Sequence, residues 1–159
     1  MLQQDLAQQF EAALLQLRNE INAYTHHDRL WKTDGDIKNS GGTLCVHLIG
    51  NLSYYIGAVL GLSGYQRNRE QEFAGNPVPS GSLIKQIDEL LYQTKTTIAS
   101  LTDDQLFGNY PLNDGKPWKT TVARLLHLLA HLNYHLGQIN YHRRLLDPPV
   151  SLPADVNKL

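Results

Sequence analysis

The sequence predicts an all-α protein, a four-helix bundle, on the basis of three observations. Apolar residues recur every three or four positions in four long segments, which is the period of an amphipathic helix. The segments between them are rich in Gly, Pro and polar residues, which are typical of turns and loops. The chain has 159 residues, enough for one domain with its own hydrophobic core. Four long helices in a chain of this size favour a bundle.

The first two helices are expected over residues 3–31 and 43–62. The first segment contains neither Pro nor Gly, and its apolar face consists of Leu6, Phe10, Leu14, Leu17, Ile21 and Tyr24. Residues 32–42 lie between the two helices and carry Gly, Asp, Asn and Ser at close intervals. This composition predicts a loop.

The other two helices are expected over residues 82–101 and 118–146. Ser80 or Ser82 is the expected N-cap of the third helix. Its apolar face consists of Leu83, Ile87, Leu90, Leu91, Thr94 and Ile98. A polar loop over residues 102–117 leads to the fourth helix, whose apolar face consists of Val122, Leu125, Leu129, Leu132, Leu136 and Ile139.

The ends and the long connection suggest how the helices run. Two prolines after Asp147 end the fourth helix, because Pro cannot continue a helical hydrogen-bond ladder. The connection over residues 63–80 is long enough to cross the bundle from end to end, which allows the second and third helices to run parallel. We therefore expect one bundle over residues 1–146 and a C-terminal tail over residues 147–159, of which the last ten or so residues are loosely attached.

Composition argues against several classes of protein. Fourteen basic and fifteen acidic residues give a formal net charge of -1, which argues against a protein that binds nucleic acid through its phosphates. The apolar runs are too short to span a membrane, and the first residues lack the basic start and apolar run of a signal peptide. Cys45 is the single cysteine, which excludes an intramolecular disulfide and suits a reducing compartment. We therefore expect a cytoplasmic protein that binds neither nucleic acid nor membrane.

His131 and His135 have the spacing of a metal-binding pair. His131 and His135 are four residues apart in the fourth expected helix, so their Cβ atoms are about 5–6 Å apart on one face. Two imidazoles at this spacing can bind one metal ion, as they do in the HExxH motif. Here no Glu follows the first His, so the general base of that motif is missing.

A third ligand has to come from another helix, and His47 lies in the middle of the second one. Three imidazoles would leave coordination positions open for water or substrate, which is typical of catalytic metal sites. Nitrogen ligands suit Zn, Ni, Cu, Co or Fe. Asn51 and Tyr54 share the helix face of His47, whereas His127 and His142 share the face of the other two ligands and have no assigned role.

The segment from Leu126 to Ile139 resembles the HxxxHxGQ signature of the DinB-like superfamily, also called the DinB/YfiT-like metalloenzymes. It carries both histidines of the pair and Gly137-Gln138, with Leu136 where a basic residue is commoner. Two other features are similar: a His with a nearby Asn in the second helix, and a loop, QRNREQEF, like the Arg-rich, Glu-Phe loop of one uncharacterised branch. The resemblance covers about residues 1–146.

This resemblance implies a fold, a metal site and a class of reaction. The fold would be an up-down-down-up bundle with a long crossover between the second and third helices. The metal ligands would be His47, His131 and His135, with Zn, Ni or a similar divalent ion. Characterised relatives include S-transferases and an isomerase that use low-molecular-weight thiols, and such members commonly form homodimers. We therefore expect a homodimer that acts on a small molecule.

The leading hypothesis is a mononuclear metal enzyme in which the metal lowers the pKa of a bound water or thiol and so supplies a nucleophile. A thiol-dependent S-transferase is the first choice, and a metal-dependent hydrolase is the alternative. Candidate catalytic helpers are Asn51, Tyr54 and Gln138. Arg67 and Arg69 are candidates to hold the carboxylate of a thiol cofactor, because a guanidinium binds a carboxylate in bidentate fashion.

Two other interpretations do not involve catalysis. The histidines could stabilise a dimeric bundle that binds a metal or another ligand without turning it over. They could also form a buried polar cluster with no metal, since a histidine on a helix is more often a surface residue or a hydrogen-bonded core residue. The arginines of the loop would then be solvated.

Overall fold

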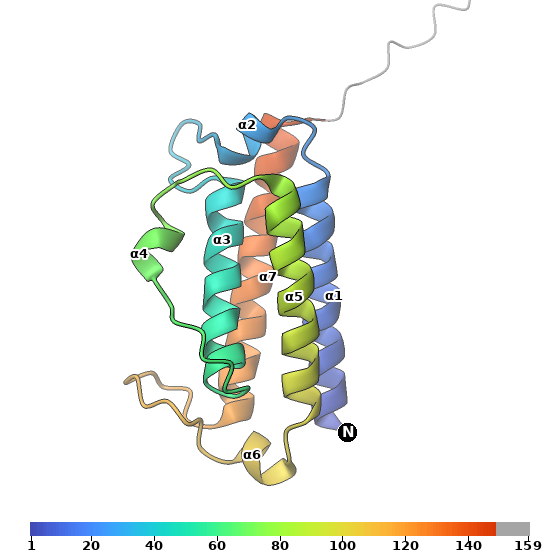
Figure 1. Cartoon of the computed structure of the whole chain (residues 1–159), viewed down its shortest axis with the longest axis vertical. Coiled ribbons are helices and arrows are strands. Elements are labelled where there is room, and N and C mark those ends of the chain that lie inside the picture. The colour runs from blue at the N-terminus through green and yellow to red at the C-terminus, as the bar shows by residue number, and fades with distance from the viewer. Residues whose placement is uncertain (149–159) are drawn as a thin grey trace, which may run out of the picture.

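The computed structural model describes residues 1–148, and this part of the chain is all-helical. Four long helices lie side by side (Figure 1): α1 (Leu2–Asn22), α3 (Gly41–Leu52), α5 (Ser80–Ala99) and α7 (Thr121–Leu146). A short π-helix continues α3 over Ser53–Ala58 and is called η1. The prediction of an all-α protein is confirmed for these residues.

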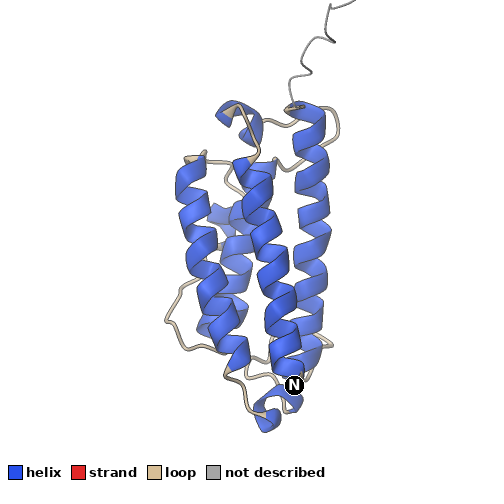
Figure 2. Cartoon of the chain, turned by 90° about the vertical axis from the view of Figure 1, so that its right-hand side faces the viewer, coloured by secondary structure: helices blue, strands red, loops and turns tan. Residues whose placement is uncertain are grey.

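Three short helices lie in the connections: α2 (His27–Trp31), α4 (Arg69–Glu72) and α6 (Asp103–Phe107). α2 and α6 lie at opposite ends of the long helices, and α4 lies beside α3 (Figure 1). Figure 2 shows no strand, and the β pairing within residues 1–148 is one isolated bridge between Asn109 and Thr120. Within the same residues, no helix combines the length and apolarity that a bilayer crossing requires.

The apolar faces expected from the sequence form much of the core. α1 packs mainly against α5 and α7, and α3 packs against α7 and α5. The buried residues of the expected faces are Leu6, Phe10, Leu14, Leu17, Ile21, Leu83, Ile87, Leu90, Thr94, Ile98, Leu125, Leu132, Leu136 and Ile139. Burial of these side chains is the main favourable contribution to folding.

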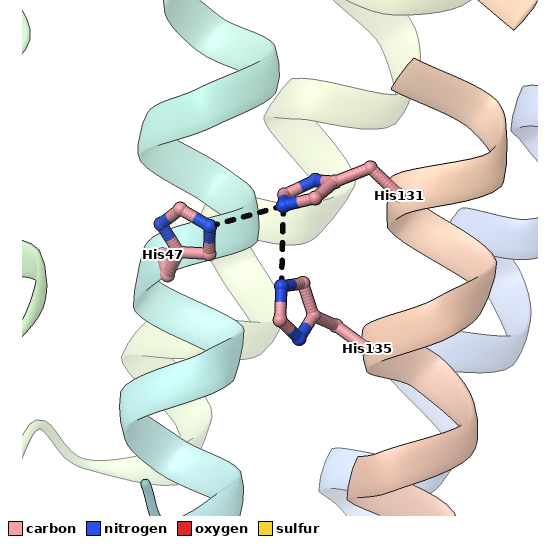
Figure 3. Close-up of side chains that lie close together, drawn as sticks. All are labelled: His47, His131 and His135. Carbon is pink, nitrogen blue, oxygen red and sulfur yellow. Dashed lines mark hydrogen bonds between the residues drawn. The ribbon is translucent and has the colours of Figure 1, made fainter. Parts of the chain in front are cut away.

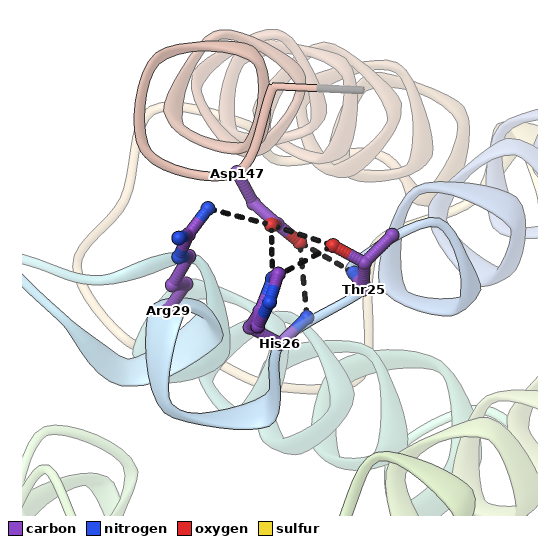
Figure 4. A network of polar contacts seen from close by, with 4 residues as sticks. All are labelled: Thr25, His26, Arg29 and Asp147. Carbon is purple, nitrogen blue, oxygen red and sulfur yellow. Dashed lines mark hydrogen bonds and ion pairs between the residues drawn. The ribbon is translucent and has the colours of Figure 1, made fainter. Parts of the chain in front are cut away.

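The expectation of one helix over residues 3–31 is wrong, because the chain breaks between α1 and α2. His26 is extended, with φ -121° and ψ 116°. The cause is the buried carboxylate of Asp147, which accepts hydrogen bonds from the backbone N–H groups of Thr25 and His26 (Figure 4). It also accepts from the Thr25 hydroxyl at 2.7 Å, His26 Nδ1 at 2.9 Å and Arg29 Nη1 at 3.2 Å. Backbone groups held in this way cannot join a helical ladder.

The same contacts bear on the expected tail. Its first residue, Asp147, is 1% exposed and is held by the α1–α2 connection. Residues 149–159 of that tail lie outside the described part of the chain.

The second helix also differs from the expected range, 43–62. The helix begins two residues earlier, at Gly41, because Ser40 caps it by accepting a hydrogen bond from the Thr43 N–H at 3.1 Å. At its other end the α-helix changes into η1, where the N–H of Val59 bonds to the carbonyl of Tyr54, five residues back, at 3.0 Å. The wider π turn shifts the side chains that follow around the helix axis.

The N-terminal boundaries of α5 and α7 were also predicted imperfectly. Pro79, not Ser80 or Ser82, occupies the N-cap position of α5 and makes no side-chain capping bond. α7 begins after Thr120, whose hydroxyl accepts from the Ala123 N–H at 3.3 Å, so the three residues before Thr121 belong to the loop.

Candidate metal centre

Three imidazoles from two helices converge between α3 and α7 (Figure 3). His47 projects from α3, and His131 and His135 project from successive turns of α7. Nε2 of His131 lies 3.3 Å from Nε2 of His47 and 3.1 Å from Nε2 of His135. One nitrogen of each ring lies within 4.8 Å of the other two. The structure therefore brings together the three residues that the sequence proposes as ligands.

Hydrogen bonds on the outer side of two rings determine which nitrogen carries the proton. Nδ1 of His47 donates to Oε2 of Glu72 at 2.8 Å, and Nδ1 of His135 donates to Oε1 of Gln138 at 2.6 Å. Because a carboxylate oxygen and an amide oxygen accept, the proton of each neutral ring lies on Nδ1. Both Nε2 atoms therefore present lone pairs to the centre.

His131 leaves this cluster with too few hydrogen-bond donors. A neutral imidazole has one N–H, so it can satisfy only one of the two facing lone pairs. Its Nδ1 is buried without a hydrogen-bond partner among the described residues. A cation that accepts a lone pair from each ring would remove the deficit. In a tetrahedral zinc site with Zn–N bonds of about 2.0–2.1 Å, ligand nitrogens are about 3.4 Å apart. The separations of 3.1 and 3.3 Å are close to that value, so this donor set fits a divalent metal ion.

Burial favours the neutral, metal-binding form of His47 and His131. Burial, together with the neighbouring His135 and His47, lowers the pKa of His131 to about 4. Burial also lowers the pKa of His47, although the hydrogen bond and charge of Glu72 oppose the shift. Because a metal competes with protons for imidazole nitrogen, rings that are neutral at pH 7 are ready to bind one.

Glu72 belongs to the site although no sequence pattern pointed to it. It is 4% exposed, and besides His47 it binds Arg67, whose Nε and Nη2 donate to its two oxygens at 2.7 and 2.8 Å. Burial alone would raise the pKa of Glu72, but hydrogen bonds from Arg67 and His47 lower it below its usual value, so the carboxyl is ionised at pH 7. A carboxylate in this position orients a ligand imidazole and increases its basicity.

Two local features bring Glu72 against α3. Asn68 caps α4 by accepting from the Gln71 N–H at 3.1 Å, which starts the single turn that ends at Glu72. Gly50 provides the space, because a Cβ at this position would overlap the Glu72 carboxylate. The sequence contained a partial signal, an acidic residue in the Arg-rich loop, but no local pattern distinguishes Glu72 from its exposed neighbour Glu70.

A cavity of about 190 Å³ opens beside His47 and His131. Asn51, one of the predicted helpers, lines this cavity, and its Oδ1 is buried with no hydrogen-bond partner within residues 1–148. Tyr54 does not line it, and Tyr55 does. The regular α-helical spacing that pointed to Tyr54 fails here because η1 widens the turn.

The two predicted arginines and three residues from later in the chain complete the cavity wall. Arg67 and Arg69 come from the connection between η1 and α5, and Lys116, Trp118 and Arg124 come from the α6–α7 connection and the start of α7. No sequence pattern points to these last three residues, because they lie about 50 positions from the arginines in the sequence and reach the cavity only through the tertiary fold.

His127 and His142 have different surroundings, and neither belongs to the cluster of three. The ring of His127 stacks on Trp118, with centroids 4.1 Å apart and planes inclined by 19°. His142 is buried and donates from Nε2 to the Lys32 carbonyl at 2.8 Å, while its Nδ1 accepts from the Tyr24 hydroxyl at 2.7 Å. These bonds give His142 a structural role at the end of the bundle.

Gln138, another predicted helper, contacts the ring of His135 through a hydrogen bond. A second and larger cavity, of about 470 Å³, is lined by both of these residues. The three imidazoles are therefore flanked by one cavity on the His131 side and another on the His135 side.

Comparisons with known proteins identify the family. No curated protein and no solved structure matches the sequence. One family model, described as "Protein of unknown function (DUF1572)", matches residues 3–148. This chain belongs to that family.

Proposed function

We propose that the chain is a member of the DinB-like superfamily and that its long helices follow the up-down-down-up order of that group. The HxxxH pair followed by Gly137-Gln138 and the histidine in the middle of α3 support this assignment. The connection between η1 and α5 supports the topology, since it runs along the outside of α3 instead of forming a tight turn (Figure 1).

We further propose that the protein is a divalent-metal-dependent enzyme with a mononuclear site made by His47, His131 and His135, with Zn or Ni as the ion. One observation carries this proposal: three Nε2 atoms face one another, and two of them present lone pairs because Glu72 and Gln138 hold their Nδ1 protons. A cluster that serves only to satisfy polar groups would pair donors with acceptors.

When bound, a divalent ion would supply Lewis acidity and lower the pKa of a water or thiol beside it. The residues of the chain would do the rest. Glu72 and Gln138 keep the ligand rings in one tautomer and one orientation. Asn51 lines the cavity and would contact the substrate through its amide.

A thiol-dependent S-transferase is the reaction we favour, with a low-molecular-weight thiol as the nucleophile and a small electrophile as the acceptor. The cationic residues of the smaller cavity support this choice, since they suit a co-substrate that carries a carboxylate. A metal-dependent hydrolase would use the same centre with water as the nucleophile.

Metal analysis of protein purified without a His tag tests the centre. We expect about one Zn or Ni per chain, and we expect His47→Ala to lose most of it. His27→Ala is the matched control, because His27 is exposed and is not one of the clustered histidines. Absence of stoichiometric metal in the unmodified protein would refute the proposal and leave a buried polar cluster.

An activity screen separates the enzymatic reactions from a non-catalytic bundle. Metal-loaded protein is incubated with several low-molecular-weight thiols and electrophilic acceptors, and in parallel with ester and amide substrates without thiol. A strict thiol requirement supports S-transfer, and turnover without thiol supports hydrolysis. Metal binding without turnover, combined with a sharp loss of stability on chelation, would indicate a structural site instead.

A further inference from the structure

The smaller cavity beside the three histidines has a strongly cationic wall. Four of its lining residues are Arg67, Arg69, Lys116 and Arg124. The carboxylates paired with them are Glu72, which binds Arg67, and Asp114, which accepts from Arg124 Nη2 at 2.7 Å. Within residues 1–148, Arg69 and Lys116 form no ion pair. The wall therefore carries two positive charges in excess of its paired carboxylates.

Arg124 gives this wall a buried and fixed hydrogen-bond donor. The residue is 3% exposed, and its guanidinium carbon lies 5.3 Å from the ring centre of Tyr55 and 4.8 Å from that of Tyr110. Two aromatic contacts and the bond to Asp114 hold the guanidinium in place. Its Nε and the Oδ2 of Asp114, two atoms of the same ion pair, are both buried without a hydrogen-bond partner among the described residues. Arg124 therefore contributes a fixed positive charge to the wall.

Not every arginine of the wall is available for a ligand. Arg67 directs Nε and Nη2 at Glu72, so its main role is to hold that carboxylate against His47. Arg69 and Lys116 are exposed and unpaired, and they stand at the cavity together with Arg124. The sequence alone does not distinguish the two loop arginines, but their contacts in the structure give them different roles.

We propose that this cavity binds the oxyanion group, a carboxylate or a phosphate, of a small substrate through Arg69, Lys116 and Arg124. This inference rests on the proposed function, since it places the rest of the substrate beside the three histidines. The cavity is small, about 190 Å³, which suits the acidic end of a small organic acid. Trp118 and His127, whose rings stack on each other, also line it.

Calorimetric titration of the zinc-loaded and the metal-free protein tests the oxyanion site, with malonate and inorganic phosphate as probes and malonamide as the uncharged control. We expect malonate or phosphate to bind in both forms and malonamide not to bind. The probe that binds more tightly identifies the acidic group. Arg69→Ala and Lys116→Ala should each weaken binding at least about tenfold, because each removes a charged partner of the anion.

Matched variants keep the interpretation specific. Lys119→Ala removes a lysine of the same connection, and Arg144→Ala removes an exposed arginine that lies over an aromatic ring as Arg69 does. Neither residue lines this cavity, so both variants should bind the anion as the unmodified protein does. Arg124→Lys keeps the charge but loses the planar guanidinium that lies over Tyr55 and Tyr110, and it should also bind more weakly.

Several results would overturn the inference. It is wrong if neither anion binds, if malonamide binds as well as malonate, or if the control variants lose binding as much as Arg69→Ala and Lys116→Ala. Binding that requires zinc and is insensitive to both substitutions would show that the anion binds the metal instead. Zinc binding without anion binding would refute this inference alone, and anion binding by a protein that takes up no metal would refute the proposed function alone.

Discussion

Replacing Glu72 by Gln tests whether this carboxylate prepares His47 to bind a metal. The amide has nearly the same size and can still accept the Nδ1 proton of His47, but it carries no charge. We expect the zinc affinity to fall 10- to 100-fold, the range typical for the loss of a carboxylate that supports a ligand histidine. The fold should survive, because the change leaves the volume of the buried side chain almost unaltered.

The geometry of the carboxylate explains this range. The Glu72 side chain is 4% exposed and that of His47 is 7% exposed, so solvent screens their interaction little. A hydrogen bond to a charged group contributes about 1.5–3 kcal/mol and one between neutral groups about 0.5–1.5 kcal/mol, so the exchange costs about 1–1.5 kcal/mol, or roughly tenfold. The upper end follows from Arg67, which donates to both Glu72 oxygens. An amide that turns its oxygen to His47 turns its NH₂ group towards Arg67 Nε, and the facing donors would displace the side chain.

Competition against a fluorescent zinc chelator at neutral pH measures the effect. Glu70→Gln is the matched control, since Glu70 lies on the same short helix but is exposed. Circular dichroism confirms that both variants are folded. A Glu72→Gln protein that binds zinc within twofold of the Glu70→Gln protein would refute the role assigned to this carboxylate.

Three further predictions follow from buried groups. Gly50→Ala should weaken zinc binding about as much as Glu72→Gln does, because the new Cβ displaces the Glu72 carboxylate. The double variant should lose little more zinc affinity than either single variant. Additive losses in the chelator competition assay would contradict this explanation. Asp147→Asn should destabilise the protein by about 3 kcal/mol, or roughly 6–12 °C in Tm, measured by calorimetry at neutral pH. Burial would raise the pKa of Asp147, but hydrogen bonds from the α1–α2 connection lower this pKa well below its usual range. The stability that ionised Asp147 contributes is present above the unfolded pKa of about 3.9 and is lost as the pH falls towards the folded value. The unmodified and Asp147→Asn proteins should therefore have similar stabilities in strong acid. The free energy of unfolding of the metal-free protein, measured by urea titration, should fall as the pH falls from 6.5 towards 4. In this range His131 takes up a proton in the unfolded chain but not in the folded one, where its pKa is about 4. A His131→Asn protein with an equally steep pH dependence would argue against this explanation.

The sequence predicts the long helices well, because their apolar spacing is a local property. It does not predict where they break. The break between α1 and α2 depends on Asp147, which lies 122 residues from Thr25 and reaches it only after α7 has packed on α1. The apolar spacing of residues 43–62 likewise does not indicate the switch from α3 to η1.

The same distinction between local and long-range information applies to the site. His131 and His135 are one helical turn apart, and His47 stands near the middle of α3, so helical periodicity suffices to propose them together. Glu72 lies in a connection without periodicity, and only the approach that Gly50 permits reveals its function. Regular helical spacing places Tyr54 on the face of His47, whereas the residue of η1 that lines the cavity is Tyr55.

The proposed metal centre and the proposed oxyanion site are built from different elements of the fold. The nitrogen atoms that face one another come from α3 and α7, whose packing against each other fixes their separation. Two of the three residues of the proposed oxyanion site, Arg69 and Lys116, come from connections. Connections tolerate substitution better than packed helices do, so under the two proposals a bundle of this kind would change the acid that it accepts and keep the three histidines. Glu72 is the exception, because it lies at the end of α4 in a connection and yet controls His47. Substitutions at Arg69 or Lys116 should therefore alter anion binding and leave zinc affinity unchanged, whereas any change in the loop that moves Glu72 should affect zinc affinity first.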